Sequence, residues 1–397
     1  MRTQVAIVGA GPAGLLLAHL LHLRGIESVV IEARSRDYVE HRVRAGVLEQ
    51  GTVDTLTDSG VGERMLREGL VHHGIELRFG GQGHRIAFEK LVPGRAITVY
   101  GQQEVVKDLI AARLAAGGEI LFEVADVVPE GFDGPRPQVS FTHDGERKVI
   151  QADFIAGCDG FHGVCRDAIP AGVLAFFDKE YPFGWLGVLA AVAPSSEELI
   201  YSSNARGFAL HSMRSPTLSR FYLQVAPDED IANWPDDRIW AELAARLETV
   251  PGWSLSTGPV VEKGITAMRS FVAEPMQYGR LYLAGDAAHI VPPTGAKGLN
   301  LAAFDVTVLT EALAAWYSSG EEALLDAYSQ TCLRRVWRAQ HFSWWMTTLL
   351  HSFDSYDAYD RRLQESYRDY VCTSDAASTS LAENYVGLGR YRPAGTA

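Results

Sequence analysis

The chain has 397 residues, of which 47% are hydrophobic and 21% are charged, and its formal net charge is −13. This composition is typical of a globular protein of about two or three domains, and the acidic balance argues against a general nucleic-acid or membrane-surface binder. The four cysteines have no CxxC spacing, which excludes a disulfide scaffold and favours reduced thiols in a cytoplasmic protein.

The N-terminal residues have the pattern of a strand, a helix and a second strand. Residues 4–9 are largely apolar, residues 12–24 carry leucines at helical spacing, and residues 27–32 contain a β-branched run. Glycines interrupt this apolar region, so it predicts neither a signal peptide nor a membrane helix. Because no uninterrupted apolar run of about 18 residues occurs elsewhere, we expect no membrane span.

A glycine motif joins the first strand to the helix. Gly9, Gly11 and Gly14 have GxGxxG spacing, which allows a tight turn, a close approach of a pyrophosphate to the backbone and close packing of helix on strand. Glu32 ends the second strand, where an acidic residue accepts a ribose hydroxyl. The unit therefore predicts dinucleotide binding, without distinguishing FAD from NAD.

The rest of the chain alternates between strand-like and helical segments. The predicted strands cover residues 75–90, 96–100, 119–128, 137–142, 149–156, 181–226 and 279–285, and the predicted helices cover residues 102–116 and 236–248. A mixed helical region precedes residue 70, and most of the remainder to about residue 372 is helical.

Two of these strands are followed by an aspartate. Asp159 lies at the end of the strand in residues 153–160, and Asp286 at the end of the strand in residues 279–289. A carboxylate there can accept hydrogen bonds from ribityl or ribose hydroxyls, although each aspartate alone is equally typical of a helix N-cap. The glycine motif and the two aspartate segments, in this order, resemble the FAD-binding signature of the class A flavoprotein monooxygenases.

Longer segments are similar to the members of that family that hydroxylate 4-hydroxybenzoate. These segments are residues 42–50, 181–185, 269–271, 289–300, 342–346 and 383–387, and the similarity extends from about residue 2 to residue 388. The resemblance implies an α/β fold. It would combine a Rossmann-like FAD-binding domain of the glutathione-reductase type, an inserted mixed β-sheet substrate domain and a helical C-terminal region.

The resemblance also implies a division into domains. The FAD-binding domain would comprise residues 1–180, of which residues 71–100 contribute to the substrate domain. Residues 181–268 would form the substrate domain, and residues 269–348 would return to the FAD domain. Residues 349–397 would form a helical region at a dimer interface, followed by a tail.

Roles for individual residues follow from the same resemblance. FAD would be held by Gly9, Gly11, Gly14, Glu32, Arg42, Arg44, Val47, Gln102, Asp159, Asp286, Gly298, Leu299 and Asn300. The substrate would contact Tyr201, Ser212, Arg214, Arg220, Tyr222 and Pro293. The catalytic group would comprise Tyr201, Tyr385 and His72, which relay a proton, and Pro293. The nicotinamide cofactor would contact Arg34, Tyr38, His162, Arg166 and Arg269.

The residues themselves give partial support to this substrate pocket. Ser212 and Arg214 are two apart in a predicted strand, so both side chains point to one face. A guanidinium on that face can hold a benzoate carboxylate through two parallel hydrogen bonds. Arg220 and Tyr222 share a face by the same rule. The same alternation is also typical of an ordinary half-exposed strand.

The implied reaction is the hydroxylation of 4-hydroxybenzoate at the 3-position, to 3,4-dihydroxybenzoate, in the breakdown of aromatic compounds. Non-covalent FAD, reduced by NADH or NADPH, would react with O2 to form a C4a-hydroperoxide that transfers oxygen to the ring. The ring is activated when the phenol loses its proton, and His72 suits the end of the relay because imidazole titrates near neutral pH. The expected partners are a small phenolic acid, O2 and a second copy of the chain, with no nucleic acid, membrane or metal.

Selectivity between the two nicotinamide cofactors depends on the residues after Glu32. Members of the family that prefer NADPH carry arginine directly after this acid, whereas this chain carries Ala33. Arg34 and Arg36 are nearby, but a shift of one residue on a helix turns a side chain by about 100°, and Asp37 would repel a phosphate. The segment therefore predicts weakened preference for NADPH, with NADH used comparably or better.

Three other functions are compatible with parts of the pattern. The first is a sister hydroxylase of another phenolic acid, which is favoured by His211 and Met213, because relatives carry other residues there. By alternation, however, both side chains point away from Ser212 and Arg214. The others are a dehydrogenase or oxidase that uses FAD without hydroxylation, and a flavoprotein that only binds partners.

Overall fold

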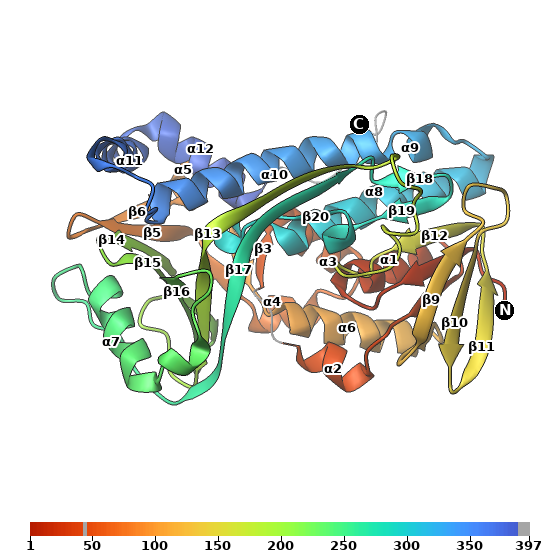
Figure 1. The fold of residues 1–397 in the computed structure, drawn as a ribbon, viewed down its shortest axis with the longest axis horizontal. Helices are drawn as coiled ribbons and strands as arrows, with labels where there is room; N and C mark the ends of the chain where they lie inside the picture. The colour runs from red at the N-terminus through yellow and green to blue at the C-terminus, as the bar shows by residue number, and fades with distance from the viewer. Residues whose placement is uncertain (43–45, 388–397) are drawn as a thin grey trace.

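A computed structural model describes residues 1–42 and 46–387 of the chain (Figure 1). Arg44 and the predicted tail beyond residue 387 therefore lie outside the described residues. In the described part, the strands form a six-stranded sheet, an eight-stranded sheet and two three-stranded sheets. The α/β class predicted from the sequence is confirmed. The eight-stranded sheet contains the candidate residues Tyr201, Ser212, Arg214, Arg220, Tyr222 and Arg269.

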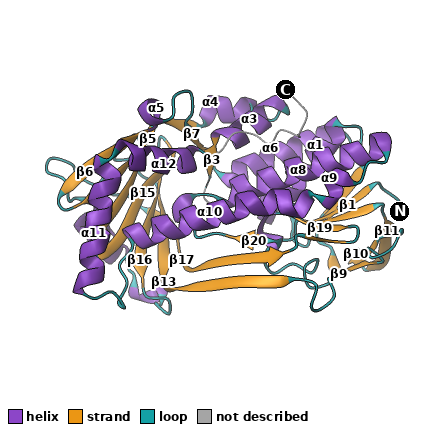
Figure 2. Cartoon of the chain, turned by 90° about the horizontal axis from the view of Figure 1, so that it is seen from above, coloured by secondary structure: helices purple, strands orange, loops and turns teal. Residues whose placement is uncertain are grey.

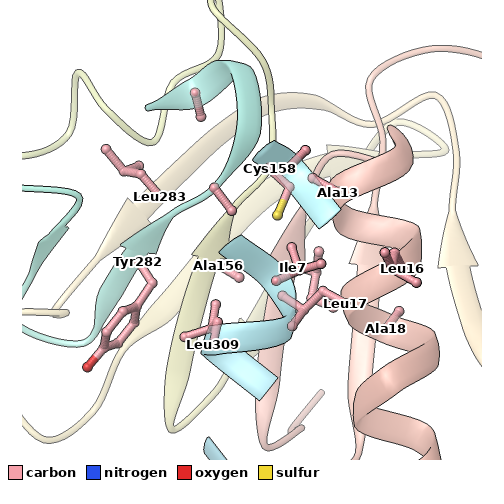
Figure 3. Close-up of a cluster of buried hydrophobic side chains, with 14 of the residues drawn as sticks. Ile7, Ala13, Leu16, Leu17, Ala18, Ala156, Cys158, Tyr282, Leu283 and Leu309 are labelled. Carbon is pink, nitrogen blue, oxygen red and sulfur yellow. The ribbon is translucent and has the colours of Figure 1, made fainter. Parts of the chain in front are cut away.

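The six-stranded sheet contains the predicted strand–helix–strand unit. Its order is β18 (Gln277–Tyr278), β19 (Leu281–Leu283), β12 (Phe154–Gly157), β1 (Val5–Val8), β2 (Ser28–Ile31) and β8 (Glu119–Leu121). The central strands β1, β2 and β12 are parallel and buried throughout, as expected for a sheet covered on both faces. Leu16 and Leu17 of α1 (Pro12–Leu23) and Leu309 of α8 (Gly298–Ser319) belong to one buried cluster with Ile7 and Ala156 of the sheet (Figure 3).

The eight-stranded sheet is built mainly from the middle of the chain. Its order is β20 (His289–Ile290), β17 (Val260–Glu274), β13 (Ala175–Ala190), β16 (Leu218–Val225), β15 (Gly207–Ser215), β14 (Leu199–Asn204), β5 (Gly74–Phe79) and β6 (Gln82–Ala87). The long strands β13 and β17 are antiparallel and run between the two halves of the molecule (Figure 1). Each strand therefore continues through one of the domain boundaries suggested by the sequence, at residues 180 and 268.

Two segments differ from the strands predicted by pattern. Residues 260–274 were not predicted as a strand, because much of β17 is half-buried or exposed and lacks a regular apolar alternation. The single strand predicted at 149–156 is two strands of different sheets. They are β11 (Glu146–Gln151), in a sheet with β9 (Ala125–Glu130) and β10 (Gln138–His143), and β12 of the six-stranded sheet. The last sheet joins β3 (Val47–Glu49), β7 (Ile97–Val99) and β4 (Leu70–His72).

Helices cover the sheets and continue further than the pattern predicted. The other helices are α2 (Arg36–His41), α3 (Gln50–Asp58), α4 (Glu63–Glu68), α5 (Phe88–Leu91), α6 (Gln102–Ala115), α7 (Asp236–Leu247), α9 (Ala323–Asp326), α10 (Tyr328–Leu350), α11 (Ala358–Thr373) and α12 (Asp375–Val386), with short 3-10 turns η1 (Ile231–Asn233), η2 (Gly285–Ala287) and η3 (Pro293–Gly295). Helix α10 spans much of the length of the molecule (Figure 2). The helical region therefore extends beyond residue 372 to Val386.

Helix α8 is the one element of the described residues that is long and apolar enough to cross a membrane. In its 18-residue apolar window, 61% of the residues are buried inside the protein. It packs against α1 and α10, and Leu309 contributes to the cluster in Figure 3. We therefore interpret α8 as a core helix, since most of its apolar window is buried against other parts of the protein.

Candidate active site

The glycine motif places three residues without side chains at the N-terminus of α1. Gly9 has φ +105°, and a Cβ there or at Gly14 would clash with backbone carbonyl oxygens. A Cβ at Gly11, the N-cap residue, would meet nothing within 4 Å. Free amides and open space at a helix N-terminus are what a pyrophosphate requires. These three residues therefore fit the phosphates of FAD.

Two carboxylates flank this loop. Glu32 accepts hydrogen bonds from the backbone N–H groups of Ala10 and Arg34, each at 2.8 Å, so it fixes the loop and the start of the next segment. Asp159 accepts one from the N–H of Cys165 at 2.9 Å. Its Oδ1 is buried and has no partner among the described residues, and burial raises the pKa of this carboxyl. A hydroxyl donor of a ligand would satisfy that oxygen, so Asp159 also fits FAD.

Asn300 joins the start of α8 to β3 and α3. Its Oδ1 accepts hydrogen bonds from the N–H of Glu49 at 2.9 Å and from Thr52 Oγ1 at 2.8 Å, and its Nδ2 donates to the carbonyl of Val47 at 3.0 Å. The predicted residues Val47, Gly298, Leu299 and Asn300 therefore lie in two segments that meet here, although Val47 and Asn300 are 253 residues apart in the chain.

The remaining predicted FAD contacts lie on separate elements. Arg42 follows α2, and its guanidinium lies 5.6 Å from the ring centroid of Tyr38. Gln102 is the first residue of α6. Asp286 lies in the turn η2 directly after β19. Arg44 lies outside the described residues.

A buried ion-pair network beside this region was not singled out from the sequence. Lys297 Nζ donates to Glu49 Oε1 at 2.6 Å and to the carbonyl of Tyr385 at 3.0 Å. Arg335 donates to Glu49 Oε2 at 2.6 Å. Burial lowers the pKa of Lys297, against the opposing effect of Glu49. A lysine within the Gly- and Pro-rich segment 289–300 was the available sequence signal.

The predicted substrate residues lie on neighbouring strands of the eight-stranded sheet. Tyr201 of β14 is opposite Leu210 of β15, and Leu210 is opposite Tyr222 of β16. Residues directly opposite each other share a face of the sheet. Arg220 lies on the same face, with its guanidinium 5.3 Å from the ring centroid of Tyr222.

Arg214 is held at the edge of this face by its neighbour in the strand. Its Nη1 donates to Ser212 Oγ and to the carbonyl of Met213, each at 2.8 Å, so the predicted proximity of Arg214 and Ser212 is confirmed. Its Nε is buried and has no partner among the described residues. Burial lowers the pKa of this guanidinium. Such a group is stabilised by an anion.

His211 and Met213, which flank Ser212 in the sequence, lie in different surroundings. His211 is buried on the opposite face, where it packs on Phe221 and accepts a hydrogen bond from the N–H of Ser195 at 3.0 Å. Met213 belongs instead to the buried cluster that includes Tyr201. The register of β15 against β16 shifts just after Met213, so simple alternation does not hold there.

A pair of buried tyrosines lies next to this face. The hydroxyls of Tyr201 and Tyr385 are hydrogen-bonded to each other, and Tyr201 also donates to the carbonyl of Thr294 at 3.3 Å, next to Pro293. Burial raises the pKa of both phenols above the ordinary value. Both groups are therefore neutral at physiological pH.

His72, the third member of the predicted relay, is not bonded to the tyrosines. It is 2% exposed, and neither ring nitrogen has a hydrogen-bond partner among the described residues. Burial lowers its pKa to about 4. Phe88 lies between His72 and the tyrosine pair. Its N–H donates to the carbonyl of His73, and its ring stacks on that of Tyr385, with 5.5 Å between the ring centroids.

The predicted nicotinamide contacts form two groups. Around the ring of Phe161 lie His162, Arg166 and Arg269, with centroid distances of 5.0, 4.8 and 4.6 Å. Arg34 lies 5.4 Å from the ring of Tyr38, in the segment after Glu32. In the first group, Arg269 is ion-paired with Asp178, and Arg166 donates to the carbonyls of Phe161 and Ala287.

Comparison with known proteins shows the family to which the chain belongs. The family model described as FAD binding domain matches residues 2–343. The chain is 52% identical to p-hydroxybenzoate hydroxylase of Acinetobacter baylyi, over 98% of this chain and 96% of that protein. It is 28% identical to 3-(3-hydroxy-phenyl)propionate/3-hydroxycinnamic acid hydroxylase of Mycobacterium avium, over 82% of this chain and 57% of that protein.

Solved structures show the same fold. The structure of p-nitrophenol 4-monooxygenase from Pseudomonas putida has a TM-score of 0.82, with 20% sequence identity, and the similarity covers 97% of this chain and 99% of that chain. The fold, the glycine loop and the family match lead to one conclusion. The chain belongs to the FAD-binding family of the class A flavoprotein monooxygenases, and it is an FAD-dependent oxidoreductase.

Proposed function

We propose that this flavoprotein hydroxylates 4-hydroxybenzoate at the 3-position, to 3,4-dihydroxybenzoate, with O2 and NADH or NADPH as co-substrates. The observation that carries the proposal is the half-buried Arg214, whose Nε is itself buried and has no hydrogen-bond partner among the described residues. A carboxylate would complete the hydrogen bonds of this cation through its planar fork. The name of the 52% identical relative supports the same substrate.

The register of the strands supports a ligand with a carboxylate at one end and a phenol at the other. Tyr201 lies opposite Leu210, and Ser212 follows Leu210 by two residues, which is about 7 Å along a strand. This spacing is close to the length of a 4-hydroxybenzoate ion. With its carboxylate at Arg214 and Ser212, such a ligand would reach the hydroxyl of Tyr201 with its phenol.

Tyr201 and Tyr385 would then carry the phenolic proton away from the ring. Because burial raises the pKa of both tyrosines, each passes the proton on and does not keep the negative charge. His72, in its neutral form, would accept the proton at the far end of the relay. FAD, when bound, supplies the activation of O2. The buried setting of the tyrosines excludes water from the proton path.

Product analysis tests the proposed function. The purified holoenzyme is incubated with 4-hydroxybenzoate, NADH or NADPH, and 18O2, and the products are identified by mass spectrometry. We expect 3,4-dihydroxybenzoate with one labelled oxygen. A sister hydroxylase would form a labelled product only from another phenolic acid. A dehydrogenase would consume nicotinamide without incorporating label, and a binding protein would do neither.

Non-covalent FAD gives a first testable prediction. The purified protein should be yellow, and denaturation should release FAD into solution, because Gly9, Gly11 and Asp159 leave space and an unpaired acceptor for it. Absorbance and chromatography of the released cofactor measure this. A substitution of Gly11 by valine should weaken FAD binding, whereas the same change at Gly264 of β17, where a Cβ would also meet nothing within 4 Å, should not. A folded protein that gains no flavin absorbance when FAD is added would contradict the proposal.

The choice of nicotinamide gives a second prediction. Ala33 has no donor for a 2′-phosphate, and Arg36 is paired with Glu40 at 2.7 Å. The missing ionic contact corresponds to about 1–3 kcal/mol, or about 5- to 150-fold. We therefore expect comparable or higher kcat/KM for NADH, and an increase of that size in the NADPH/NADH ratio on Ala33→Arg. A preference of the unchanged enzyme for NADPH above about 100-fold would mean that another arginine binds the phosphate.

We also propose that two copies of the chain associate through the helical C-terminal region. Large aromatic side chains are exposed on α10 and α11, namely Trp337, Trp344, Tyr359, Tyr367 and Tyr370. Aromatic residues are enriched in protein interfaces. In the same proposal, the domain with the six-stranded sheet binds the flavin, and the domain with the eight-stranded sheet binds the substrate. We place the enzyme in the cytoplasm.

A further inference from the structure

His72, at the end of the proposed proton relay, lies near a carboxylate that has no role in the mechanism proposed above. Glu198 comes immediately before β14, where Leu199 is paired in parallel with Ile75 of β5. This register places Glu198 beside Gly74, two residues after His72. A Cβ at Gly74 would lie 3.0 Å from Glu198 Oε2, so the lack of a side chain at this glycine lets the carboxylate approach the backbone next to His72.

An arginine fixes the position of this carboxylate. Arg85 of β6 donates from Nε to Glu198 Oε2 at 2.7 Å and from Nη2 to Glu198 Oε1 at 2.8 Å. The side chain of Glu198 is 18% exposed, whereas that of Arg85 is 44% exposed. The bidentate pair is therefore oriented, with its negative end toward the protein interior and its positive end toward solvent.

We propose that Glu198, held by Arg85, is a positioning residue that stabilises the protonated form of His72 while the substrate proton leaves the active site. The inference rests on the proposed function and extends it to the exit of the proton. The proton would pass from the Tyr385 side to a ring nitrogen of His72, forming an imidazolium, and then to water. Glu198 stays ionised throughout and does not itself accept the proton.

Charges around His72 are consistent with this role. Desolvation lowers the pKa of His72, the negative charge of Glu198 opposes that effect, and His73 adds to it. His72 in turn contributes to lowering the pKa of His211, after desolvation and the charge of Arg78. Among these groups and Arg85, Glu198 is the one that stabilises an imidazolium. Without it, a buried histidine would accept a proton less readily.

The test compares Glu198→Gln with Glu89→Gln, its matched control. Glu89 binds the same guanidinium of Arg85, at 2.8 Å, from a more exposed position, so both variants remove one ion pair of Arg85. 4-Hydroxybenzoate is mixed with the holoenzyme that contains oxidised FAD. The release of protons is followed with an indicator dye, and the formation of the substrate phenolate is followed by its absorbance. We expect about 10-fold slower proton release in Glu198→Gln, which corresponds to one unit of pKa at His72.

The control and the charge-conserving variant complete this experiment. Glu89→Gln should stay within about two-fold of the unchanged enzyme, since exposed ion pairs contribute little. Glu198→Asp should recover most of the rate. The dissociation constant of 4-hydroxybenzoate should be the same in all variants. Equal slowing in Glu198→Gln and Glu89→Gln, or no slowing in either, would overturn the proposal.

A second measurement does not depend on the substrate. In ligand-free holoenzyme with 15N-labelled histidine, the His72 ring signals are assigned from their loss in His72→Asn. The protonated fraction of this ring at mildly acidic pH should fall about 10-fold in Glu198→Gln and not in Glu89→Gln. An unchanged titration would overturn the role of Glu198. Absence of 3,4-dihydroxybenzoate from the unchanged enzyme would instead contradict the proposed function, and the ring titration would still decide the role of Glu198.

Discussion

Replacement of Tyr201 by phenylalanine is expected to leave the oxidation of nicotinamide largely intact while almost abolishing hydroxylation. The hydroxyl of Tyr201 is hydrogen-bonded to Tyr385 and to the carbonyl of Thr294, and in the proposed function it receives the phenolic proton. Without it the phenol stays protonated, and its ring carbon is a poor nucleophile. Loss of a positioned acid–base group lowers a rate by about 10²- to 10⁴-fold.

The effect of Tyr201→Phe is measured as coupling, the fraction of nicotinamide oxidation that leads to hydroxylated product. The amounts of 3,4-dihydroxybenzoate and hydrogen peroxide formed per nicotinamide oxidised are determined for each variant, and peroxide should replace product in Tyr201→Phe. Tyr181→Phe is the matched control, because Tyr181 is also a buried tyrosine whose hydroxyl is bonded, at 3.2 Å, to Ser270. Normal coupling in Tyr201→Phe would refute the relay.

Replacement of Arg214 by lysine is expected to weaken the binding of 4-hydroxybenzoate strongly. Lysine keeps the positive charge but cannot form two parallel hydrogen bonds to a carboxylate, and it also loses the contact with Ser212 Oγ. A hydrogen bond to a charged group contributes about 1.5–3 kcal/mol, so the dissociation constant should rise by about 10- to 150-fold.

Titration of the flavin absorbance with the ligand gives this dissociation constant. Arg206→Lys is a suitable control, because Arg206 is exposed in the turn between β14 and β15 and pairs with Glu242 of α7. The neutral analogue 4-hydroxybenzamide should bind weakly to both the unchanged enzyme and Arg214→Lys, with little difference between them. An unchanged dissociation constant for 4-hydroxybenzoate in Arg214→Lys would show that Arg214 does not bind the substrate carboxylate.

Local sequence patterns determined the parts of the molecule that are contiguous in the chain. The unit from β1 to β2 was predicted because its glycines, its helix and Glu32 occupy one stretch of about thirty residues, in which spacing and burial depend on backbone geometry alone. The contact of Arg214 with Ser212 follows similarly from the period of a strand. Met213 departed from that period because the register shifts beside it, and a pattern of alternation contains no sign of such a shift.

Pairings between distant segments were decided by the tertiary structure. The hydroxyls of Tyr201 and Tyr385 meet across 184 residues, and only the family resemblance anticipated this. Strand β17, which is ordered by its pairing with β13, had no local signal. For the network of Glu49 with Lys297 and Arg335, the sequence offered only a lysine in segment 289–300 and did not indicate its partners. Sequence periodicity reports which face of an element is buried. Which elements share that face depends on sheet register and packing, and these alone bring Tyr201 of β14 beside Leu210 of β15 and into contact with Tyr385 of α12.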